Sequence, residues 1–249
     1  MMGKHIAMKG ILIIGLFLVV LCSFISTCSA RTIVVSKDGN GKYTSIQAAI
    51  DAAESGTLIE VHNGSYNENI VIDKSVDLIG NGSESTRIFG KSETRHGITI
   101  LSDWVNVSGF EIRLTSHVKL KGILIEANHS KITETRCVGN AYGIYLKEAF
   151  RIIISGNECI GNSEYGAYAE NSDHITFSRN RCNENKRAGI NIRGDYDFMM
   201  ENISLIEIEC NDNEERGISI VFSGNAEVIK NSCLGNGKDG IILSAMGLQ

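Results

Sequence analysis

The feature that most constrains the fold of this chain is a sequence pattern that repeats along most of its length. Asn-x-Cys-x-x-Asn occurs at 157–162 and again 23 residues later at 180–185. A glycine followed by alternating apolar residues recurs in the same rhythm at Gly97, Gly122, Gly143, Gly166, Gly189, Gly217 and Gly240. A second fixed position of the repeat is held by Cys137, Cys159, Cys182, Cys210 and Cys233.

Each copy of the repeat is predicted to be one turn of a parallel β-helix. Apolar residues alternate with a period of two inside each copy, which is the spacing of a strand with one buried face. One copy cannot bury its apolar side alone, so successive copies must stack and fill a continuous core. We therefore expect an all-β parallel β-helix with three short strands per turn and about seven to eight turns. A leucine-rich repeat is the alternative, but its leucine-rich consensus is missing.

A short helix is predicted at 44–55, before the first turns. Thr44-Ser45-Ile46-Gln47 has the pattern of a capping box, and Gly56 is a stop signal. We expect this amphipathic helix to cover the N-terminal end of the β-helix, which otherwise exposes apolar core and strand edges. No such segment precedes Gln249, so we expect either a partner that covers the open C-terminal end or a sequence that is a fragment.

Residues 1–30 are predicted to be a secretory signal peptide, which leaves 31–249 as the β-helix domain. Lys4 and Lys9 precede an unbroken apolar run, and Ala30 ends a stretch of small residues that suits cleavage. The apolar run is short for a membrane span. An uncleaved anchor and a lipoprotein are the alternatives.

Secretion agrees with the presence of five Asn-x-Ser sequons, which would make this a glycoprotein in a glycosylating host. The sequons begin at Asn63, Asn81, Asn106, Asn128 and Asn202. The protein is therefore expected to be secreted or at the cell surface, with no membrane contact beyond the signal segment. The net charge of −5 argues against nucleic acid as a partner, because phosphate binding requires a basic face.

The N-terminal part carries a family resemblance. The segment IVVSKDGNGKYTSIQAAIDAAESGTLIEVHNGSYNENIVIDKSVDLIGNG resembles the N-terminal cap of right-handed pectin-lyase-like β-helices, in particular pectin methylesterases. The later turns, with Asn-x-Cys-x-x-Asn and Tyr-Gly-Ile, resemble the NosD-type repeats of archaeal and bacterial surface proteins. The two resemblances together cover about 32–243, and they imply that the Gly-Ile-x-Ile strands form the first sheet, whose outer face usually binds sugar in enzymes of this superfamily.

A candidate carbohydrate surface lies on that predicted outer face. Tyr142, Tyr145, Tyr165 and Tyr168 occupy its outward positions in two adjacent turns. Arg193 and Asp195 follow the same strand in the next turn, which is the longest. Aromatic faces beside charged hydrogen-bonding groups suit sugar binding. Ordinary exposed tyrosines and a tolerated loop insertion are the simpler explanation.

No catalytic, metal or cofactor site is predicted. Cleavage of a glycan requires paired carboxylates, and Asp195 and Asp197 are the only close pair near the tyrosines, so they are weak candidates. The motifs that the methylesterase resemblance implies, a Gln-Asp pair, an Asp-Phe strand end and an Arg-Pro-Trp motif, are absent apart from an isolated Asp197-Phe198. An epimerase-type Asp-Pro-His motif is impossible because the chain has no proline. NosD-type relatives imply copper-enzyme maturation in some cases, but no pattern here is typical of a copper site.

The cysteines are expected to be buried free thiols. They occur once per turn, without a Cys-x-x-Cys pair or a histidine companion, so they lack the spacing of a metal site. Small apolar thiols pack well in an inward position. Strained disulfides between turns are the alternative.

The predicted function is that of a secreted or cell-surface, non-catalytic β-helix protein. Its role would be structural, adhesive or carbohydrate-binding, with a polysaccharide or cell-surface glycan as the partner. One alternative is a polysaccharide-active enzyme of the lyase, hydrolase or epimerase type that uses the outer face of the first sheet. The other is a NosD-like accessory protein.

Overall fold

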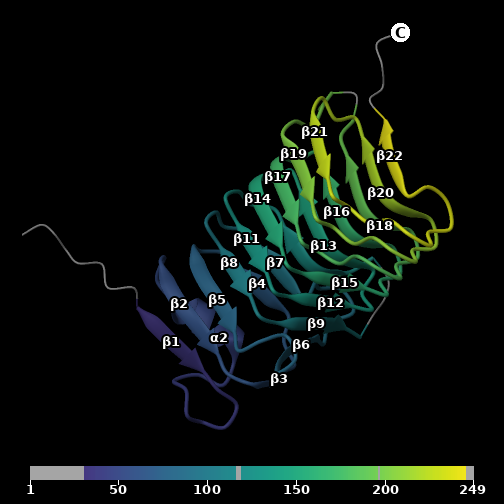
Figure 1. Cartoon of the computed structure of the whole chain (residues 1–249). Helices are drawn as coiled ribbons and strands as arrows, with labels where there is room; N and C mark the ends of the chain where they lie inside the picture. Colours follow the sequence, from purple (N-terminus) through teal and green to yellow (C-terminus); the bar gives the residue numbers. More distant parts are fainter. Residues whose placement is uncertain (1–30, 116–118, 196, 245–249) are drawn as a thin grey trace, which may run out of the picture. The chain divides into compact units, whose positions relative to one another are not determined.

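The chain coils into a parallel β-helix whose wall consists of three sheets (Figure 1). The computed structural model describes residues 31–115, 119–195 and 197–244, so the predicted signal peptide at 1–30 lies outside the described residues. Within the described ranges, no helix has the length and apolar character required to cross a membrane.

The largest sheet has nine parallel strands. In spatial order they are β1 (Thr32–Val35), β2 (Thr57–Val61), β5 (Val76–Gly80), β8 (Asn106–Ser108), β11 (Lys131–Thr133), β14 (Phe150–Ser155), β17 (Asp173–Ser178), β19 (Ile203–Ile206) and β21 (Ala226–Ile229). Each strand comes from one turn, so the β-helix has about nine turns rather than the predicted seven to eight. The prediction was low because the residues before Gly97 coil without the glycine by which the turns were counted.

The second sheet has eight parallel strands and contains the glycine positions. In spatial order they are β4 (Ile70–Ile72), β7 (Ile98–Ile100), β10 (Lys121–Ile125), β13 (Tyr142–Lys147), β16 (Tyr165–Glu170), β18 (Ala188–Arg193), β20 (Arg216–Val221) and β22 (Ile241–Ser244). The strand register confirms the predicted repeat, because the residue after one glycine aligns with the residue after the next. Ile98, Ile123 and Ile144 lie side by side in this way and are fully buried.

The third sheet has five parallel strands. They are β3 (Gly64–Tyr66), β6 (Thr86–Gly90), β9 (Glu111–Leu114), β12 (Arg136–Val138) and β15 (Glu158–Ile160). Cys137 pairs with Ile112 on one side and Cys159 on the other, as the repeat predicts. The five cysteines among the described residues are free, and all except the half-buried Cys233 are buried. A hydrogen bond with Cys159, together with burial, raises the pKa of the Cys137 thiol, so it remains a neutral core side chain.

Buried asparagines align the turns that connect the strands. The side-chain oxygen of Asn162 accepts from the backbone N–H of Asn140 at 3.0 Å, and that of Asn185 accepts from Asn162 at 3.0 Å. Asn157 and Asn180 make the equivalent contact at 2.9 Å in a second column. These amides satisfy backbone groups that the strand ladder leaves unpaired.

Helix α2 (Ile46–Ala52) packs on β1, β2 and β4 at the N-terminal end of the β-helix. It is shorter than the predicted 44–55, and its N-cap is Ser45 rather than Thr44. The reciprocal contact of a capping box does not come from Gln47. Instead the carboxylate of Glu68, from a different turn, accepts the N–H groups of Ile46 and Gln47 at 3.1 and 3.0 Å.

Candidate functional site

Four tyrosines meet on β13 and β16, at the outer face of the eight-stranded sheet. Tyr142 pairs in register with Tyr165, and Tyr145 pairs with Tyr168. The ring centroids of these two pairs are 5.7 and 5.0 Å apart, and the Tyr145 and Tyr168 rings are stacked. All four side chains are half-buried. We call these four residues the tyrosine surface. Their role in sugar binding remains a prediction.

Positive charge borders the tyrosine surface on both sides. The Lys121 ammonium on β10 lies 5.5 Å from the Tyr142 ring centroid and 5.0 Å from that of Tyr145. On the other side, the Arg187 guanidinium lies 5.7 Å from the Tyr165 ring centroid and donates to the Tyr165 hydroxyl at 3.3 Å. Cations over aromatic faces are attracted by the ring quadrupole.

The hydroxyls of Tyr145 and Tyr168 are kept protonated by their surroundings. Burial raises the pKa of Tyr145 strongly, and a hydrogen bond to the Glu170 carboxylate adds to the shift. Burial and the nearby Glu170 charge raise the pKa of Tyr168 to about 12. Both side chains therefore act as hydrogen-bond donors, not as bases, at neutral pH.

Lys121 and His96 lie on neighbouring turns beside the tyrosine surface. The backbone N–H of Lys121 donates to Nδ1 of His96 at 3.2 Å. Burial, followed by the charge of Lys121, lowers the pKa of His96, so the imidazole is neutral at neutral pH. Because Nδ1 accepts this bond, the ring proton lies on Nε2, which is available as a donor. Burial also lowers the pKa of Lys121.

Two cations of this face have no ion-pair partner in the described part of the chain. The neighbouring Lys147 is paired with Glu126 at 3.1 Å, and Arg187 with Glu164 at 2.8 Å. Lys121 and Arg193 form no such pair among the residues described. Arg193 is exposed on β18, in register with Glu170. An anionic ligand on this face would therefore find two available cations.

Asp195 and Asp197 lie on the loop that follows β18. One carboxylate oxygen of Asp195 accepts from the backbone N–H groups of Asp197 and Phe198, both at 2.9 Å. The other accepts from Asn171 at 2.9 Å, and this bond is the main cause that lowers the pKa of Asp195. The Asp195 carboxylate therefore holds the loop in shape, and the two aspartates remain weak catalytic candidates.

The sequence repeat alone predicted only part of the group formed by the tyrosine surface and its charged neighbours. Lys121 stands one residue before Gly122, as Tyr142 stands before Gly143, so its outward position could be read from the repeat. Glu170 and Arg187 were missed because their partners, Tyr145 and Tyr165, are 25 and 22 residues away in the chain. Only the register of the strands brings these side chains together.

The five sequons differ in exposure. Asn63, Asn81 and Asn202 are exposed, whereas Asn106 and Asn128 are half-buried. The side-chain oxygen of Asn128 accepts from the backbone N–H of Phe150 at 3.0 Å, which makes its amide less available. Glycosylation remains a prediction at all five. Within the described ranges, no cluster of three or more His, Cys, Asp or Glu side chains could hold a metal ion.

Comparison with known proteins identifies two family matches. The model of the Pectinesterase family matches residues 32–117, and the model "Right handed beta helix region" matches residues 165–247. The Arabidopsis thaliana protein "Probable pectinesterase/pectinesterase inhibitor 6" is 40% identical over 82 residues, which cover 29% of this chain and 15% of that protein. "Probable pectinesterase/pectinesterase inhibitor 59" of the same plant is 41% identical over 76 residues, 27% of this chain and 14% of that protein.

Solved structures share the fold along most of the chain. Pectate lyase Pel9A has a TM-score of 0.59 at 14% identity and covers 80% of this chain and 70% of its own. The A-module of the Azotobacter vinelandii mannuronan C-5 epimerase AlgE6 has a TM-score of 0.55 at 15% identity, with coverage of 80% and 70%. The periplasmic alginate epimerase AlgG has a TM-score of 0.54 at 18% identity, with coverage of 74% and 47%.

The prediction of a non-catalytic protein is wrong. The Pectinesterase match and the identity to plant pectinesterases support the alternative, a polysaccharide-active enzyme. The prediction was wrong because it required catalytic groups to lie close together in the sequence. In a stacked β-helix, groups such as Lys121 and Glu170 belong to different turns, yet both border the Tyr145 ring.

Proposed function

This chain is a right-handed parallel β-helix of the pectin-lyase-like fold, and we propose that it is an enzyme that cleaves esters on an acidic polysaccharide. One observation carries this proposal. The segment that matches the Pectinesterase family contributes β4 and β7 to the eight-stranded sheet, with His96 just before β7, and the next strands of that sheet bear Lys121 and the tyrosine surface. The matched part and the candidate site therefore belong to one continuous face.

The acidic character of the substrate is inferred from the charges of that face. The tyrosine rings offer faces on which sugar rings can stack. Lys121 and Arg193, the two cations without an ion-pair partner among the described residues, can each pair with a uronate carboxylate. The paired Lys147 and Arg187 are less available because Glu126 and Glu164 already neutralise them.

Ester cleavage requires stabilisation of the negative charge that develops on the carbonyl oxygen. Nε2–H of His96 and the Lys121 ammonium are two donors of this face that can supply it. Glu170 accepts the Tyr145 hydroxyl and so orients the aromatic ring against which the sugar would lie. We expect the enzyme to act outside the cell, in agreement with the predicted signal peptide and sequons.

The Lys121 side chain also favours a second class of reaction, proton removal from a uronate. Burial lowers its pKa, so a neutral amine is reached at lower pH than for an exposed lysine. A neutral amine next to a uronate can remove the proton beside the carboxyl group, which is the first step of a lyase or an epimerase.

The test is incubation of the secreted protein with methyl-esterified and de-esterified polyuronates. Release of methanol identifies an esterase. Unsaturated products identify a lyase, and uronates with inverted configuration at the carbon beside the carboxyl group identify an epimerase. The Tyr145→Ala/Tyr168→Ala double variant should lose most of the turnover. Ile153→Ala, at an exposed position of the nine-stranded sheet, should retain it. Absence of turnover on every polymer, or full turnover by the double variant, would reject the proposal.

A further inference from the structure

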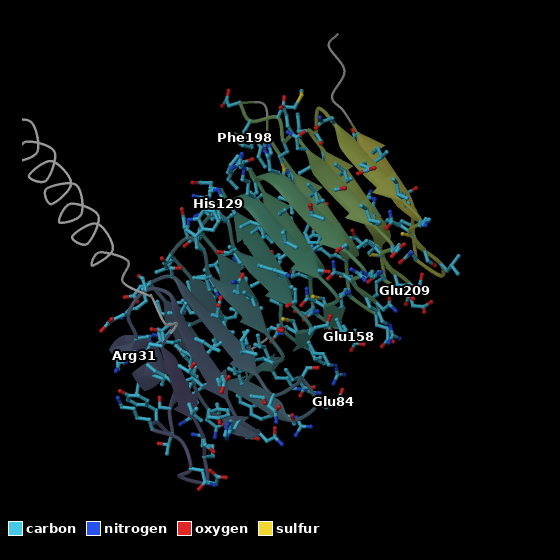
Figure 2. The ribbon with its side chains drawn as sticks, turned by 60° about the vertical axis from the view of Figure 1, so that its left-hand side comes forward. Arg31, Glu84, His129, Glu158, Phe198 and Glu209 are labelled. Carbon is cyan, nitrogen blue, oxygen red and sulfur yellow. The ribbon has the colours of Figure 1, made fainter. Side chains whose placement is uncertain are left out.

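A pocket with aromatic walls, separate from the tyrosine surface, lies at the edge where the chain passes from the eight-stranded sheet to the nine-stranded sheet. It has a volume of about 490 Å³ and is lined by Glu148, Ala149, Phe150, Asn171, Asp173 and Phe198. In Figure 2, Phe198 and His129 lie along one edge of the β-helix, and Glu84, Glu158 and Glu209 lie along the opposite edge. The pocket is therefore a feature of the edge that carries the long loop after β18.

We propose that this pocket binds an uncharged sugar ring of the same polysaccharide that the tyrosine surface binds. The inference rests on the proposed function, and it narrows the substrate to an acidic chain that also carries neutral sugars. Three properties of the pocket support it: a preformed aromatic wall, acceptors for hydroxyl groups, and a charge pattern that disfavours ions of either sign.

The aromatic wall is formed by Phe150 and Phe198. Phe198 is 36% exposed although it is a large apolar residue, and its backbone makes two hydrogen bonds with Asp195. Its backbone N–H donates to the Asp195 carboxylate at 2.9 Å, and its carbonyl accepts from the Asp195 N–H at 3.0 Å. Asn171, which lines the pocket, holds the same carboxylate at 2.9 Å. A ring held in advance costs less entropy when a ligand binds.

The polar wall consists of hydrogen-bond acceptors. Asp173 uses one oxygen for the backbone N–H of Glu201, at 2.6 Å, and its other oxygen makes no hydrogen bond among the described residues. The Glu148 carboxylate has no ion-pair partner in the described part of the chain. Carboxylates at the side of an aromatic ring suit sugar hydroxyls, which donate to them while the C–H face packs on the ring.

The charges around the pocket select against ions. Glu148 and Asp173 repel a uronate, and so separate this pocket from the cation-bordered tyrosine surface. The guanidinium of Arg151 lies 5.0 Å from the Phe150 ring centroid, so a cationic ligand at that ring would meet a like charge. An uncharged occupant avoids both costs.

The pocket and the tyrosine surface are close enough for one oligosaccharide. Strand β13 carries Tyr145 and continues into Glu148, three residues on, which spans roughly 10 Å at the rise of a strand. On the next turn, Glu170 contacts Tyr145 and is followed directly by Asn171 of the pocket. A bound acidic chain can therefore place a neutral sugar in the pocket.

The experiment measures binding by calorimetry with five probes: galactose, arabinose, N-acetylglucosamine and glucosamine oligosaccharides, and an oligogalacturonate. We expect the wild-type protein to bind at least one neutral probe, and Phe198→Ala to weaken that binding about tenfold. Met199→Ala is the matched control, since it changes the next side chain of the same loop, which is 52% exposed and does not line the pocket. Met199→Ala should bind as the wild type does.

The outcomes separate this inference from the proposed function. Phe198→Ala should leave oligogalacturonate binding unchanged, whereas Tyr145→Ala/Tyr168→Ala should weaken it and leave the neutral probe bound. No binding of any neutral probe, or equal binding by Phe198→Ala, overturns the pocket assignment even if turnover on polyuronates is found. Tighter binding of glucosamine than of N-acetylglucosamine oligosaccharides overturns the assignment of an uncharged ligand. Neutral binding that requires Phe198 supports it even if no turnover is found.

Discussion

The Tyr145 hydroxyl donates a hydrogen bond to the carboxylate of Glu170, which lies on the next turn of the β-helix. The Tyr145 ring also stacks on Tyr168, with centroids 5.0 Å and planes 24° apart. Two neighbouring turns are thus joined by a polar and an aromatic contact at the centre of the candidate site. The two contacts can be separated by substitution.

Tyr145→Phe should weaken the binding of an oligogalacturonate by about fivefold or less, because it removes one hydrogen bond and keeps the ring. Tyr145→Ala should weaken it by about tenfold or more, because it also removes the stacking face. Calorimetry at neutral pH measures both. If the Phe variant loses as much affinity as the Ala variant, the hydroxyl and not the ring is the main contact.

Lys121 provides a pH-dependent prediction. Burial lowers the pKa of its ammonium, so the charge is lost at lower pH than in an exposed lysine with a pKa of about 10.4. Binding of an oligogalacturonate should therefore weaken as the pH rises from about 7 to about 10. In Lys121→Arg the guanidinium stays charged over this range, so its binding should not change with pH.

The same variant distinguishes the two reactions considered for this face. If Lys121 only binds a carboxylate or stabilises an oxyanion, Lys121→Arg should keep a substantial part of the turnover. If a neutral Lys121 removes a proton, Lys121→Arg should bind the polymer and turn it over at least about a hundredfold more slowly. Turnover and affinity measured on the same samples separate these outcomes.

The fold was predictable because the repeated glycine shows which residues of successive turns lie side by side. One residue after each glycine is inward, and a Cβ on the glycine itself would meet backbone: at Gly143 it would lie 2.4 Å from the carbonyl oxygen of Gly166. The first turns lack this signature, so their number was underestimated. The capping contact at the start of α2 was predicted incorrectly. The carboxylate that accepts the first N–H groups of the helix belongs to Glu68, more than 20 residues beyond the helix start, and not to Gln47.

The site was less predictable, because its contacts cross between turns. The tyrosines were found since two outward positions of the repeat carry them, whereas the contact of Arg187 with Tyr165 depends on side-chain direction. Asp195 is predicted to bind substrate, and in the structure its carboxylate also accepts the backbone N–H of Phe198. A single sequence does not reveal whether a loop carboxylate faces a ligand or its own backbone.

Glu111→Gln should destabilise the protein by about 3 kcal/mol, because its side chain is only 4% exposed and faces three arginines. Its carboxylate contacts Arg113 and Arg136, each at 2.9 Å, and Arg87 at 3.4 Å. An amide would leave Arg87 and Arg113 without this counter-charge, whereas Arg136 would keep its ion pairs with Glu158 and Glu84. Urea denaturation followed by circular dichroism measures the change in the free energy of unfolding.

Glu209→Gln is the control for Glu111, because it removes a carboxylate whose ion pair is exposed, at the edge of the β-helix that also carries Glu84 and Glu158 (Figure 2). Glu209 is 59% exposed and lies 3.8 Å from Arg181, so its loss should cost less than about 0.5 kcal/mol. Equal destabilisation by the two variants would mean that burial of Glu111 contributes nothing specific.

Asn162→Ala should destabilise the protein by about 3 kcal/mol, because the amide of Asn162 makes two bonds to the backbone of the preceding turn and one to the Asn185 side chain of the next turn. Its oxygen accepts from the N–H of Asn140 at 3.0 Å, and its nitrogen donates to the Cys137 carbonyl at 3.3 Å. Asn162 is fully buried, so water cannot replace these bonds.

Asn225→Ala is the matched control, since the Asn225 side-chain oxygen accepts the backbone N–H of Asn202 at an exposed position. There water can take over, and the cost should stay below about 1 kcal/mol. Thermal and urea denaturation of the two variants measures the difference, and equal losses would show that the buried asparagine column stabilises the turns no more than an exposed contact does.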